Sequence, residues 1–196
     1  SKGKISVEAI TSTVSEVLNI PRSRVFSSST GVIGEELPHN LIIDALNKMV
    51  ADKTEHGILE AAKTIMTTDT YPKGSVRKIL TKEGEITIVG IAKGSGMIAP
   101  NMATMLVYLF TDASVKKEVL QSYLSEINEK TFNSISVDGD TSTSDTVLMA
   151  ATGQSGIRIE KNNKIFSQGL TSLMTALAHQ VVKDGAGASK YVEINI

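Results

Sequence analysis

The sequence predicts a mixed α/β fold, of the α/β or α+β class, because segments with strand and helix periodicity interleave along the chain. Two stretches rich in β-forming residues, 76–81 and 86–92, flank the polar residues 82–85 and predict a β-hairpin. Residues 114–131 repeat apolar side chains at helical spacing and predict an amphipathic helix. Together these patterns favour helices that pack on a sheet.

The N-terminal part of the chain predicts mainly helices. Residues 7–18, 41–49 and 57–66 each carry apolar side chains at helical spacing, and a proline follows the first of these segments. Residues 24–28 predict a short strand. We see no internal repeat, low-complexity stretch or linker, so one folded unit is expected.

The C-terminal part predicts further strands and one long helix. An apolar run at 105–110 predicts a strand, and another strand is expected after the acidic stretch 138–146. Asn162-Asn163 predicts a second hairpin turn. Residues 170–181 predict the last helix, and 191–194 a final strand.

Composition excludes several classes of function. Twenty basic and twenty-one acidic side chains give a net charge of −1, which gives no support for a nucleic-acid or membrane partner. Cysteine is absent, so disulfides and thiolate metal sites are excluded, and a cytoplasmic protein is expected. No apolar run is long enough to cross a bilayer, and the N-terminus lacks the layout of a signal peptide.

The most unusual stretch is 93–106, KGSGMIAPNMATML, in which a lysine opens a glycine-rich loop before a Pro-Asn turn and an Ala-Thr pair. Glycine permits backbone conformations that other residues avoid, and proline restricts its neighbours, so the loop can hold an unusual conformation. Taken alone, a stretch of this kind is typical of a surface loop between two core strands.

These fourteen residues resemble the cleavage-site motif of the ornithine acetyltransferase/glutamate N-acetyltransferase family. The segments 28–34 (SSTGVIG), 66–70 (MTTDT) and 137–143 (VDGDTST) also resemble family segments, in the family's order. The similarity extends through essentially the whole chain. It implies a layered α/β/β/α sandwich, the fold shared with self-processing aminopeptidases.

The resemblance implies a precursor that cuts itself between Ala103 and Thr104. Residues 1–103 and 104–196 would then be an α-chain-like and a β-chain-like segment that stay in one folded unit, and two of each would form a heterotetramer. The family's nucleophile corresponds to Thr104, whose freed α-amino group, with an ordinary pKa of about 7.7–8.0, would act as its base.

The same resemblance implies the rest of the site. Thr30 and Gly31 match the family's oxyanion hole, and Thr67, Lys93 and Thr104 match substrate-binding positions. The expected reaction moves the acetyl group of N-acetylornithine to glutamate and releases ornithine, within arginine biosynthesis. No metal or tightly bound cofactor is expected, and acetyl-CoA as a further acetyl donor stays open.

Three departures from the family pattern stand against full activity. Ala186 occupies a position where the family carries a glutamate that contacts the substrate's amino group, and Glu193 is the nearest glutamate in the sequence after it. Ser144 replaces the usual asparagine. The chain is also short at both ends compared with the family, so we expect either a fragment of a longer product or a reduced gene.

Other candidate sites are weaker. Asp138, Asp140 and Asp145 have some calcium-loop spacing, but the pattern lacks the sixth-position glycine and has Met149 at position twelve. Turn and cap roles are therefore preferred, and packing against the site is the functional alternative. His39, His56 and His179 belong to no motif and are expected to be structural or exposed.

Two alternative functions remain. The first is a self-processing amidohydrolase or aminopeptidase, in which water takes the acyl group. The second is a catalytically incomplete remnant or fragment of the transferase, which Ala186 and the missing ends favour.

Overall fold

The computed structural model describes residues 2–32, 34–52, 54, 57–99, 102–103 and 105–194. The chain forms two compact units, Ser1–Gly57 and Ile58–Ile196. Among the described helices, none combines the length and the apolar composition that crossing a bilayer requires.

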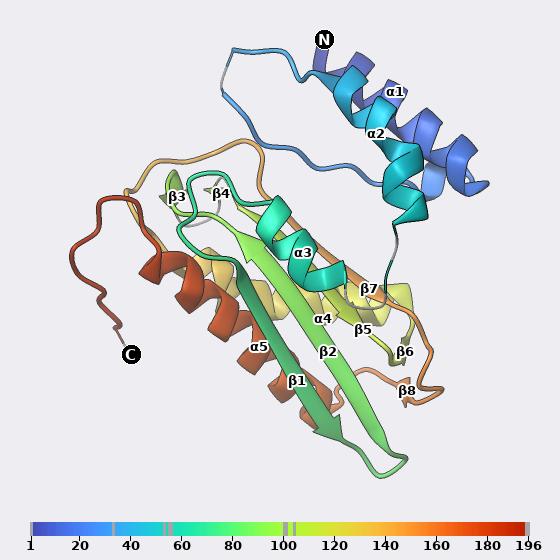
Figure 1. Cartoon of the computed structure of the whole chain (residues 1–196). Helices are drawn as coiled ribbons and strands as arrows, with labels where there is room; N and C mark the ends of the chain where they lie inside the picture. Colours follow the sequence, from blue (N-terminus) through green and yellow to red (C-terminus); the bar gives the residue numbers. More distant parts are fainter. Residues whose placement is uncertain are drawn as a thin grey trace. The chain divides into compact units, whose positions relative to one another are not determined.

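The first unit is a pair of packed helices, α1 (Lys2–Leu18) and α2 (His39–Ala51), which lie side by side in Figure 1. Ile10 and Leu46 provide its buried apolar contacts. A 3-10 turn, η1 (Arg22–Arg24), follows α1, and most of the segment from there to α2 has no regular secondary structure. The small number of buried apolar residues gives this unit a modest core of its own.

The second unit is built on a four-stranded sheet in the order β1–β2–β5–β7. Strands β1 (Lys73–Leu80), β2 (Glu85–Lys93) and β5 (Leu106–Thr111) are antiparallel neighbours, and β7 (Thr146–Ala151) runs parallel to β5. A parallel connection needs a crossover, and here α4 (Lys117–Glu129) lies between β5 and β7 in the chain.

Helices α4 and α5 (Lys164–Lys183) cover one face of this sheet, and α3 (Gly57–Thr64) lies on the other side (Figure 1). Gly90 marks the covered face, because a Cβ there would lie 2.9 Å from Leu177 and 3.0 Å from Leu173 of α5. Side chains alternate along a strand, so the odd-numbered residues of β2 face away from α4 and α5. Lys93 is one of them.

Three small elements complete the second unit. The ladder of β3 (Ile98–Ala99) and β4 (Met102–Ala103) follows the glycine-rich loop, and β6 (Ser114–Val115) pairs with β8 (Arg158–Ile159). A 3-10 turn, η2 (Phe132–Ser134), follows α4. The short ladders were not predicted, because two-residue strands have no periodicity to read.

The structure confirms the mixed α/β class and most predicted elements. The predicted helices at 7–18, 41–49, 57–66, 114–131 and 170–181 correspond to α1 to α5, and the hairpin at 76–92 corresponds to β1 and β2. The described residues supply one four-stranded sheet of the expected α/β/β/α sandwich, with α4 and α5 on one face and α3 on the other. The second sheet stays a prediction.

Three predicted elements are wrong. Residues 25–28 are irregular rather than a strand, and 191–194 form no ladder among the described residues. Asn162-Asn163 does not make a hairpin: Asn162 has a φ of 66°, and the Asn163 side chain caps α5 by accepting a hydrogen bond from the Phe166 amide at 3.0 Å. Asparagine serves both turns and N-caps, and here the cap prevails.

Candidate functional site

The loop between α3 and β1 is fastened to the loop after β2. The Asp69 carboxylate accepts hydrogen bonds from the Gly94 amide at 2.7 Å and from the Thr67 amide at 3.2 Å. The hydroxyls of Thr68 and Ser95 are 2.7 Å apart. Two segments that the sequence separates by about 25 residues therefore form one surface, which holds Thr67 close to the start of the glycine-rich loop.

A buried lysine stabilises this arrangement through ion pairs. Lys73 is fully buried, and its ammonium lies 2.6 Å from Asp69 and 2.6 Å from Asp184. Asp184 also accepts hydrogen bonds from the amide and the hydroxyl of Thr70. Each buried charge thus has opposite charge and hydrogen bonds around it, which is the condition under which buried ions are tolerated.

This cluster lowers the pKa of both aspartates. Burial alone would raise the pKa of Asp69, but the hydrogen bond from Lys73 and the amides of Gly94 and Thr67 outweigh it. For Asp184, burial is likewise outweighed by Lys73 and by the two hydrogen bonds from Thr70, so its pKa is lowered as well. Both side chains are carboxylates near neutral pH.

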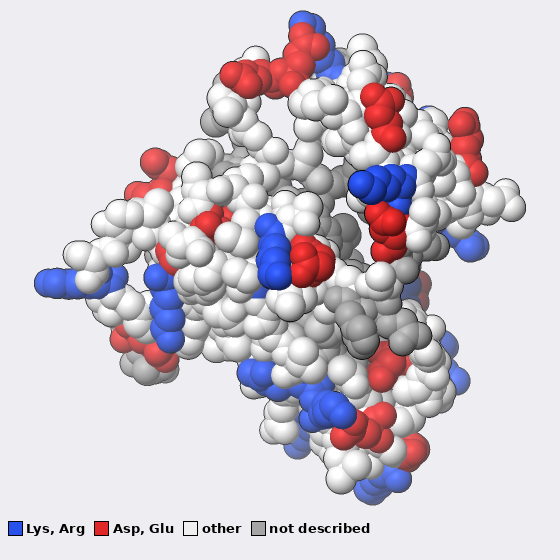
Figure 2. Space-filling model, in the orientation of Figure 1, with Lys and Arg blue, Asp and Glu red and all other residues white. Residues whose placement is uncertain are grey.

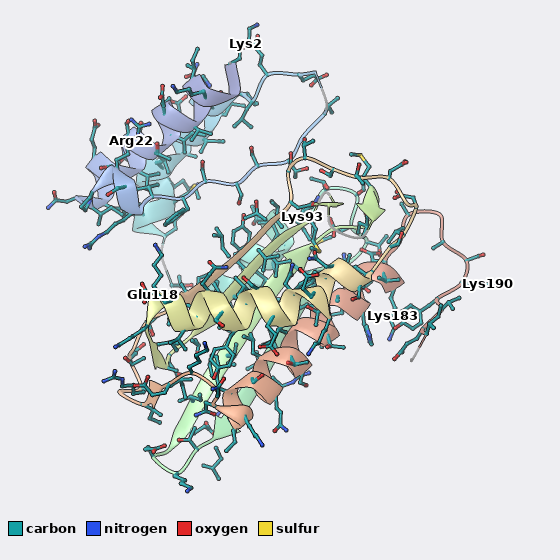
Figure 3. The ribbon with its side chains drawn as sticks, turned by 180° about the vertical axis from the view of Figure 1, so that it is seen from behind. Lys2, Arg22, Lys93, Glu118, Lys183 and Lys190 are labelled. Atoms are coloured by element: carbon teal, nitrogen blue, oxygen red, sulfur yellow. The ribbon has the colours of Figure 1, made fainter. Side chains whose placement is uncertain are left out.

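Lys93 has a different environment. It is the last residue of β2 and is only 3% exposed, at the end of the sheet where the β3–β4 ladder lies (Figure 3). Among the described residues, none lies within hydrogen-bond or ion-pair distance of its ammonium. Burial lowers the pKa of Lys93, and Lys73 lowers it further, while the charges of Asp69 and Asp145 partly restore it. A buried ammonium without a contacting partner can accept an anionic ligand.

The glycine-rich loop is held in an unusual backbone conformation. Gly94 has a φ of 153° and Met97 a φ of 54°. Asp138 accepts hydrogen bonds from the amides of Met97 at 2.6 Å and Ile98 at 3.0 Å. Burial would raise the pKa of Asp138, but these amides lower it. Asp138 therefore has the predicted turn role, and it fixes the loop that precedes the expected cleavage bond.

The β3–β4 ladder places Ala103 opposite Ile98. Thr104, the predicted nucleophile, lies outside the described residues, and so its role stays a prediction. The next residue is described: the Met105 amide donates to Asp145 at 2.9 Å, and the Met105 carbonyl accepts from the Thr146 amide at 3.0 Å. Backbone pairings of described residues thus lie on both sides of the predicted bond.

Thr30 and Gly31 lie in the irregular segment of the first unit, whereas Thr67, Lys93 and Ala103 belong to the second. Thr30 is half-buried and Gly31 is exposed. An added Cβ at position 31 meets no described atom within 4 Å, so local packing does not require glycine there. Their role as an oxyanion hole stays a prediction.

Ala186 lies directly beside the glycine-rich loop. Its amide donates to the Ser95 carbonyl at 2.5 Å, and its Cβ lies 3.8 Å from where a Cβ of Gly96 would be. The position at which a family glutamate is expected therefore borders the candidate site. Ser144 is partly buried, and its amide donates to the hydroxyl of Ser142 at 3.2 Å.

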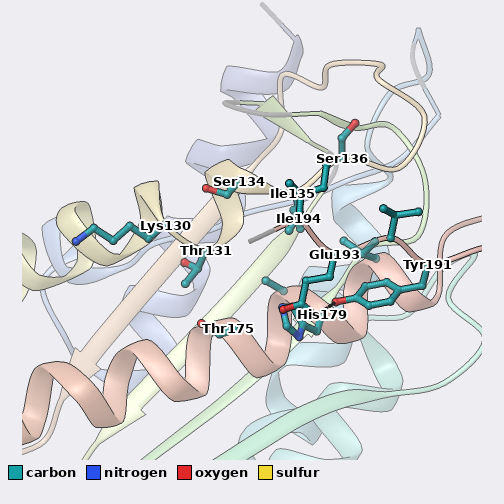
Figure 4. A pocket seen from close by; sticks show the side chains of 13 residues that line it. Lys130, Thr131, Ser134, Ile135, Ser136, Thr175, His179, Tyr191, Glu193 and Ile194 are labelled. Atoms are coloured by element: carbon teal, nitrogen blue, oxygen red, sulfur yellow. Dashed lines mark hydrogen bonds between the residues drawn. The ribbon is translucent and has the colours of Figure 1, made fainter. Parts of the chain in front are cut away.

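Glu193 lines a separate cavity of about 300 Å³ between the end of α4, η2, α5 and the C-terminal tail (Figure 4). It accepts a hydrogen bond from the Tyr191 hydroxyl at 3.3 Å, and His179 packs edge-on against the Tyr191 ring. No residue of the glycine-rich loop lines this cavity. Glu193 thus contacts Tyr191 and lines a cavity that does not include Ala186.

The two described histidines have local contacts. His39 contacts the Ser6 hydroxyl at 3.0 Å, and His179 contacts Tyr191; His56 lies outside the described residues. Among the described residues, no group of three or more His, Asp or Glu side chains is arranged to hold a metal ion.

Acidic and basic side chains alternate over the face shown in Figure 2, without a continuous patch of either sign.

The sequence did not reveal the roles of four residues in this site. Lys73, Asp69 and Asp184 form the buried cluster, and Asp145 binds the Met105 amide. The only feature of the sequence that could have identified them was a charged residue at the edge of an apolar or glycine-rich segment. That signal is weak, because most such residues are solvated.

Comparisons with known proteins agree with one another. The ArgJ family model matches residues 1–196. An arginine biosynthesis bifunctional protein ArgJ from Ruegeria pomeroyi is 51% identical over 194 residues, which are 99% of this chain and 47% of that protein. A glutamate N-acetyltransferase from Methanocaldococcus jannaschii is 45% identical over 184 residues, 92% of this chain and 46% of that protein.

A crystal structure of an arginine biosynthesis bifunctional protein from Bacillus halodurans is 38% identical, with a TM-score of 0.41, over 42% of this chain and 41% of that one. The chain spans about half the length of the curated relatives it matches, at 47% and 46% of the two named above.

Proposed function

The chain belongs to the ArgJ family, and from that premise we propose that it acts in acetyl transfer from N-acetylornithine to glutamate. The acetyl group passes first to the hydroxyl of Thr104, with release of ornithine. Glutamate then takes the acetyl group, so the energy of the acyl bond is conserved and arginine biosynthesis continues. The nucleophile becomes competent only after the chain is cut before Thr104.

The cut requires no partner other than water. The Thr104 hydroxyl attacks the carbonyl carbon of Ala103, and the C–N bond breaks as the hydroxyl proton passes to the nitrogen. The resulting ester is hydrolysed, which leaves a carboxylate on Ala103 and a free amine on Thr104. In the later acetyl transfer, this amine serves as the base that takes the proton of the Thr104 hydroxyl.

The buried ammonium of Lys93, which contacts no charged or hydrogen-bonding group among the described residues, is the observation that carries this proposal. It lies at the start of the loop that leads to the Ala103–Thr104 bond, and Thr67 is fastened to the same loop through Asp69. Both substrates carry an α-carboxylate, which a desolvated ammonium binds as a point charge. The position and charge of Lys93 therefore suit the common part of the two substrates.

The oxyanion formed by attack on the acetyl carbonyl needs donors that are already in place. We assign this role to the hydroxyl of Thr30 and the backbone N–H of Gly31. Our proposal includes no metal or cofactor, leaves acetyl-CoA as a further donor, and places the protein in the cytoplasm as a heterotetramer of two α and two β chains.

Exchange of labelled acetyl groups tests the proposal. The complete protein should move label from N-acetylornithine to glutamate by a ping-pong mechanism, and Thr104→Ala should abolish both the exchange and the cut. Persistent exchange in Thr104→Ala would rule the mechanism out. Label that ends in free acetate instead of acetylglutamate would indicate the hydrolase alternative.

Ala186 favours a second candidate, a family member that folds and cuts itself but transfers acetyl groups poorly. The methyl group beside the glycine-rich loop offers no charge to a substrate amine. Ala186→Glu should then raise kcat/KM for the exchange, whereas an unchanged kcat/KM would show that this site does not need the carboxylate.

A further inference from the structure

Asp69 joins two of the predicted substrate-binding positions, Thr67 and Lys93. Its Oδ2 accepts the N–H of Thr67 at 3.2 Å, and its Oδ1 accepts the N–H of Gly94, the residue after Lys93, at 2.7 Å. Oδ1 also accepts a hydrogen bond from the Lys73 ammonium at 2.6 Å. The side chain of Asp69 is fully buried, and hydrogen bonds are electrostatically stronger in such surroundings than in water. One carboxylate therefore determines how the Thr67 and Lys93 segments lie relative to each other.

The two buried lysines of this region lie on opposite faces of the sheet. Lys73 pairs with Ala92 in the β1–β2 ladder, and cross-strand partners point to the same face. That face is covered by α5, because Gly90, two residues before Ala92, lies against α5. Lys93 follows Ala92 and points to the other face. Asp69 contacts the Lys73 ammonium and the backbone just after Lys93, so it connects the two faces at the end of β2.

Asp69 is also the more constant of the two carboxylates whose charge acts on Lys93. Burial lowers the pKa of Lys93; the charge of Asp69 opposes this most strongly, Lys73 lowers the pKa further and Asp145 raises it. Burial raises the pKa of Asp145 itself to about 6, so this group gains a proton as pH falls toward 6. Burial acts on Asp69 in the same direction, but its hydrogen bonds outweigh burial and lower its pKa. Asp69 therefore stays negative over the range in which Asp145 titrates.

Given the acetyl transfer proposed above, we propose that Asp69 is a positioning residue that holds Thr67 and Lys93 as one binding surface for the α-carboxylate of the substrate. This role rests on the proposed function, because it takes that carboxylate to be the ligand of Lys93. Asp69 acts through the two loops that it fastens. Without it, the amides of Thr67 and Gly94 lose their shared acceptor, and Lys93 loses the carboxylate that most favours its protonated form.

Asp184 offers a matched control for the loss of stability. Its carboxylate contacts the same buried ammonium at 2.6 Å, and its side chain is 2% exposed, compared with 0% for Asp69. Its backbone partner is Thr70, whereas the amides of Thr67 and Gly94 donate to Asp69. Asp69→Asn and Asp184→Asn each remove one charge from the same ion-pair cluster and should lose similar stability. Only the first removes the carboxylate that fastens the glycine-rich loop.

The test follows the side chain of Lys93 by NMR in the complete protein, and it needs no turnover. The lysine signal that is absent from Lys93→Met assigns Lys93, and its pH titration without substrate gives the pKa of the ammonium. Added glutamate then gives a dissociation constant through the same signal. Asp69→Asn should lower the pKa of Lys93 and weaken glutamate binding on the order of 10-fold. Asp184→Asn should leave the pKa of Lys93 unchanged. In the exchange assay, KM for glutamate should rise in Asp69→Asn while kcat changes less.

Asp69→Glu keeps a charge for Lys73 to pair with but displaces it by one methylene, so it decides the question if Asp69→Asn does not fold. Its glutamate binding should be weakened, and binding equal to wild type would overturn the inference. Equal changes at Lys93 in Asp69→Asn and Asp184→Asn would also overturn it, because lost stability would explain both. A wild-type protein that binds glutamate at Lys93 but exchanges no acetyl groups would refute the proposed transfer alone. Glutamate that leaves the Lys93 signal unchanged in wild type would refute both.

Discussion

Two lysines at the same end of the sheet are buried in opposite ways. Lys73 is 0% exposed and contacts both Asp69 and Asp184 at 2.6 Å. Lys93 is 3% exposed, and among the described residues it has no contacting partner. Their burial is nearly equal, but only the first ion contacts carboxylates among the residues that the structure describes.

This difference separates a structural charge from a charge kept for a ligand. A compensated buried ion holds segments in place, because removing one partner leaves the others unpaired. An uncompensated buried ion costs folding free energy and is retained where a ligand completes its environment. Asp145 belongs with Lys93, because among the described residues one of its oxygens has a hydrogen-bond partner and the other has none.

Breaking the compensated cluster should have the largest effect. Lys73→Met leaves Asp69 and Asp184 as two buried carboxylates without a cation, which should lower the free energy of unfolding by about 3–5 kcal/mol. Urea denaturation measures this loss. A decrease in the free energy of unfolding of less than about 1 kcal/mol would show that Lys73 does not stabilise the cluster.

Replacing the uncompensated lysine should affect catalysis rather than folding. Lys93→Met removes a desolvated charge without breaking a contact to a described residue, so the urea midpoint should stay the same or rise. The loss of a substrate carboxylate contact of about 2 kcal/mol corresponds to a decrease in kcat/KM of roughly 30-fold. If Lys93→Met were destabilised while its kcat/KM stayed unchanged, Lys93 would be a structural charge and would not be kept for a ligand.

The pH dependence of stability should distinguish the two kinds of carboxyl. The pKa of Asp145 rises from 3.8 to about 6 on folding. The protonated carboxyl therefore favours the folded state below about pH 4, and this stabilisation is lost as pH rises through 6. The lowered pKa of Asp69 and Asp184 acts oppositely, with stability lost as pH falls below about 4.

Asp145→Asn should therefore gain stability relative to wild type between pH 4 and 7, as followed by thermal unfolding at each pH. A constant difference between the two proteins over this range would mean that Asp145 titrates normally.

An exposed pair should show the smallest effect. Lys78 and Glu85 lie 3.0 Å apart on the β1–β2 hairpin with side chains 68% and 50% exposed. Lys78→Ala should change the free energy of unfolding by less than about 1 kcal/mol and leave kcat/KM unchanged. A larger effect would show that exposure does not separate these lysines as we describe.

Sequence periodicity predicted the elements that have enough residues to repeat a pattern. Helices α1 to α5 and strands β1, β2, β5 and β7 were predicted in this way. The two-residue ladders were missed, and Asn162-Asn163 was misassigned because asparagine suits a turn and a helix cap equally.

The candidate site was only partly predictable. The glycine-rich loop drew attention to Lys93, and the structure places it in a buried position at the start of that loop. The cluster of Lys73, Asp69 and Asp184 joins residues more than 100 positions apart, and periodicity contains no information about such contacts. Thr30, Gly31 and Thr104 stay predictions that rest on the family.

The most direct test is the intact mass of the complete protein after incubation with N-acetylornithine alone. We predict two chains divided between Ala103 and Thr104, of which only the chain that begins with Thr104 gains one acetyl group and loses it when glutamate is added. A single uncut chain, or a cut protein whose Thr104 chain gains no acetyl group, would contradict the account.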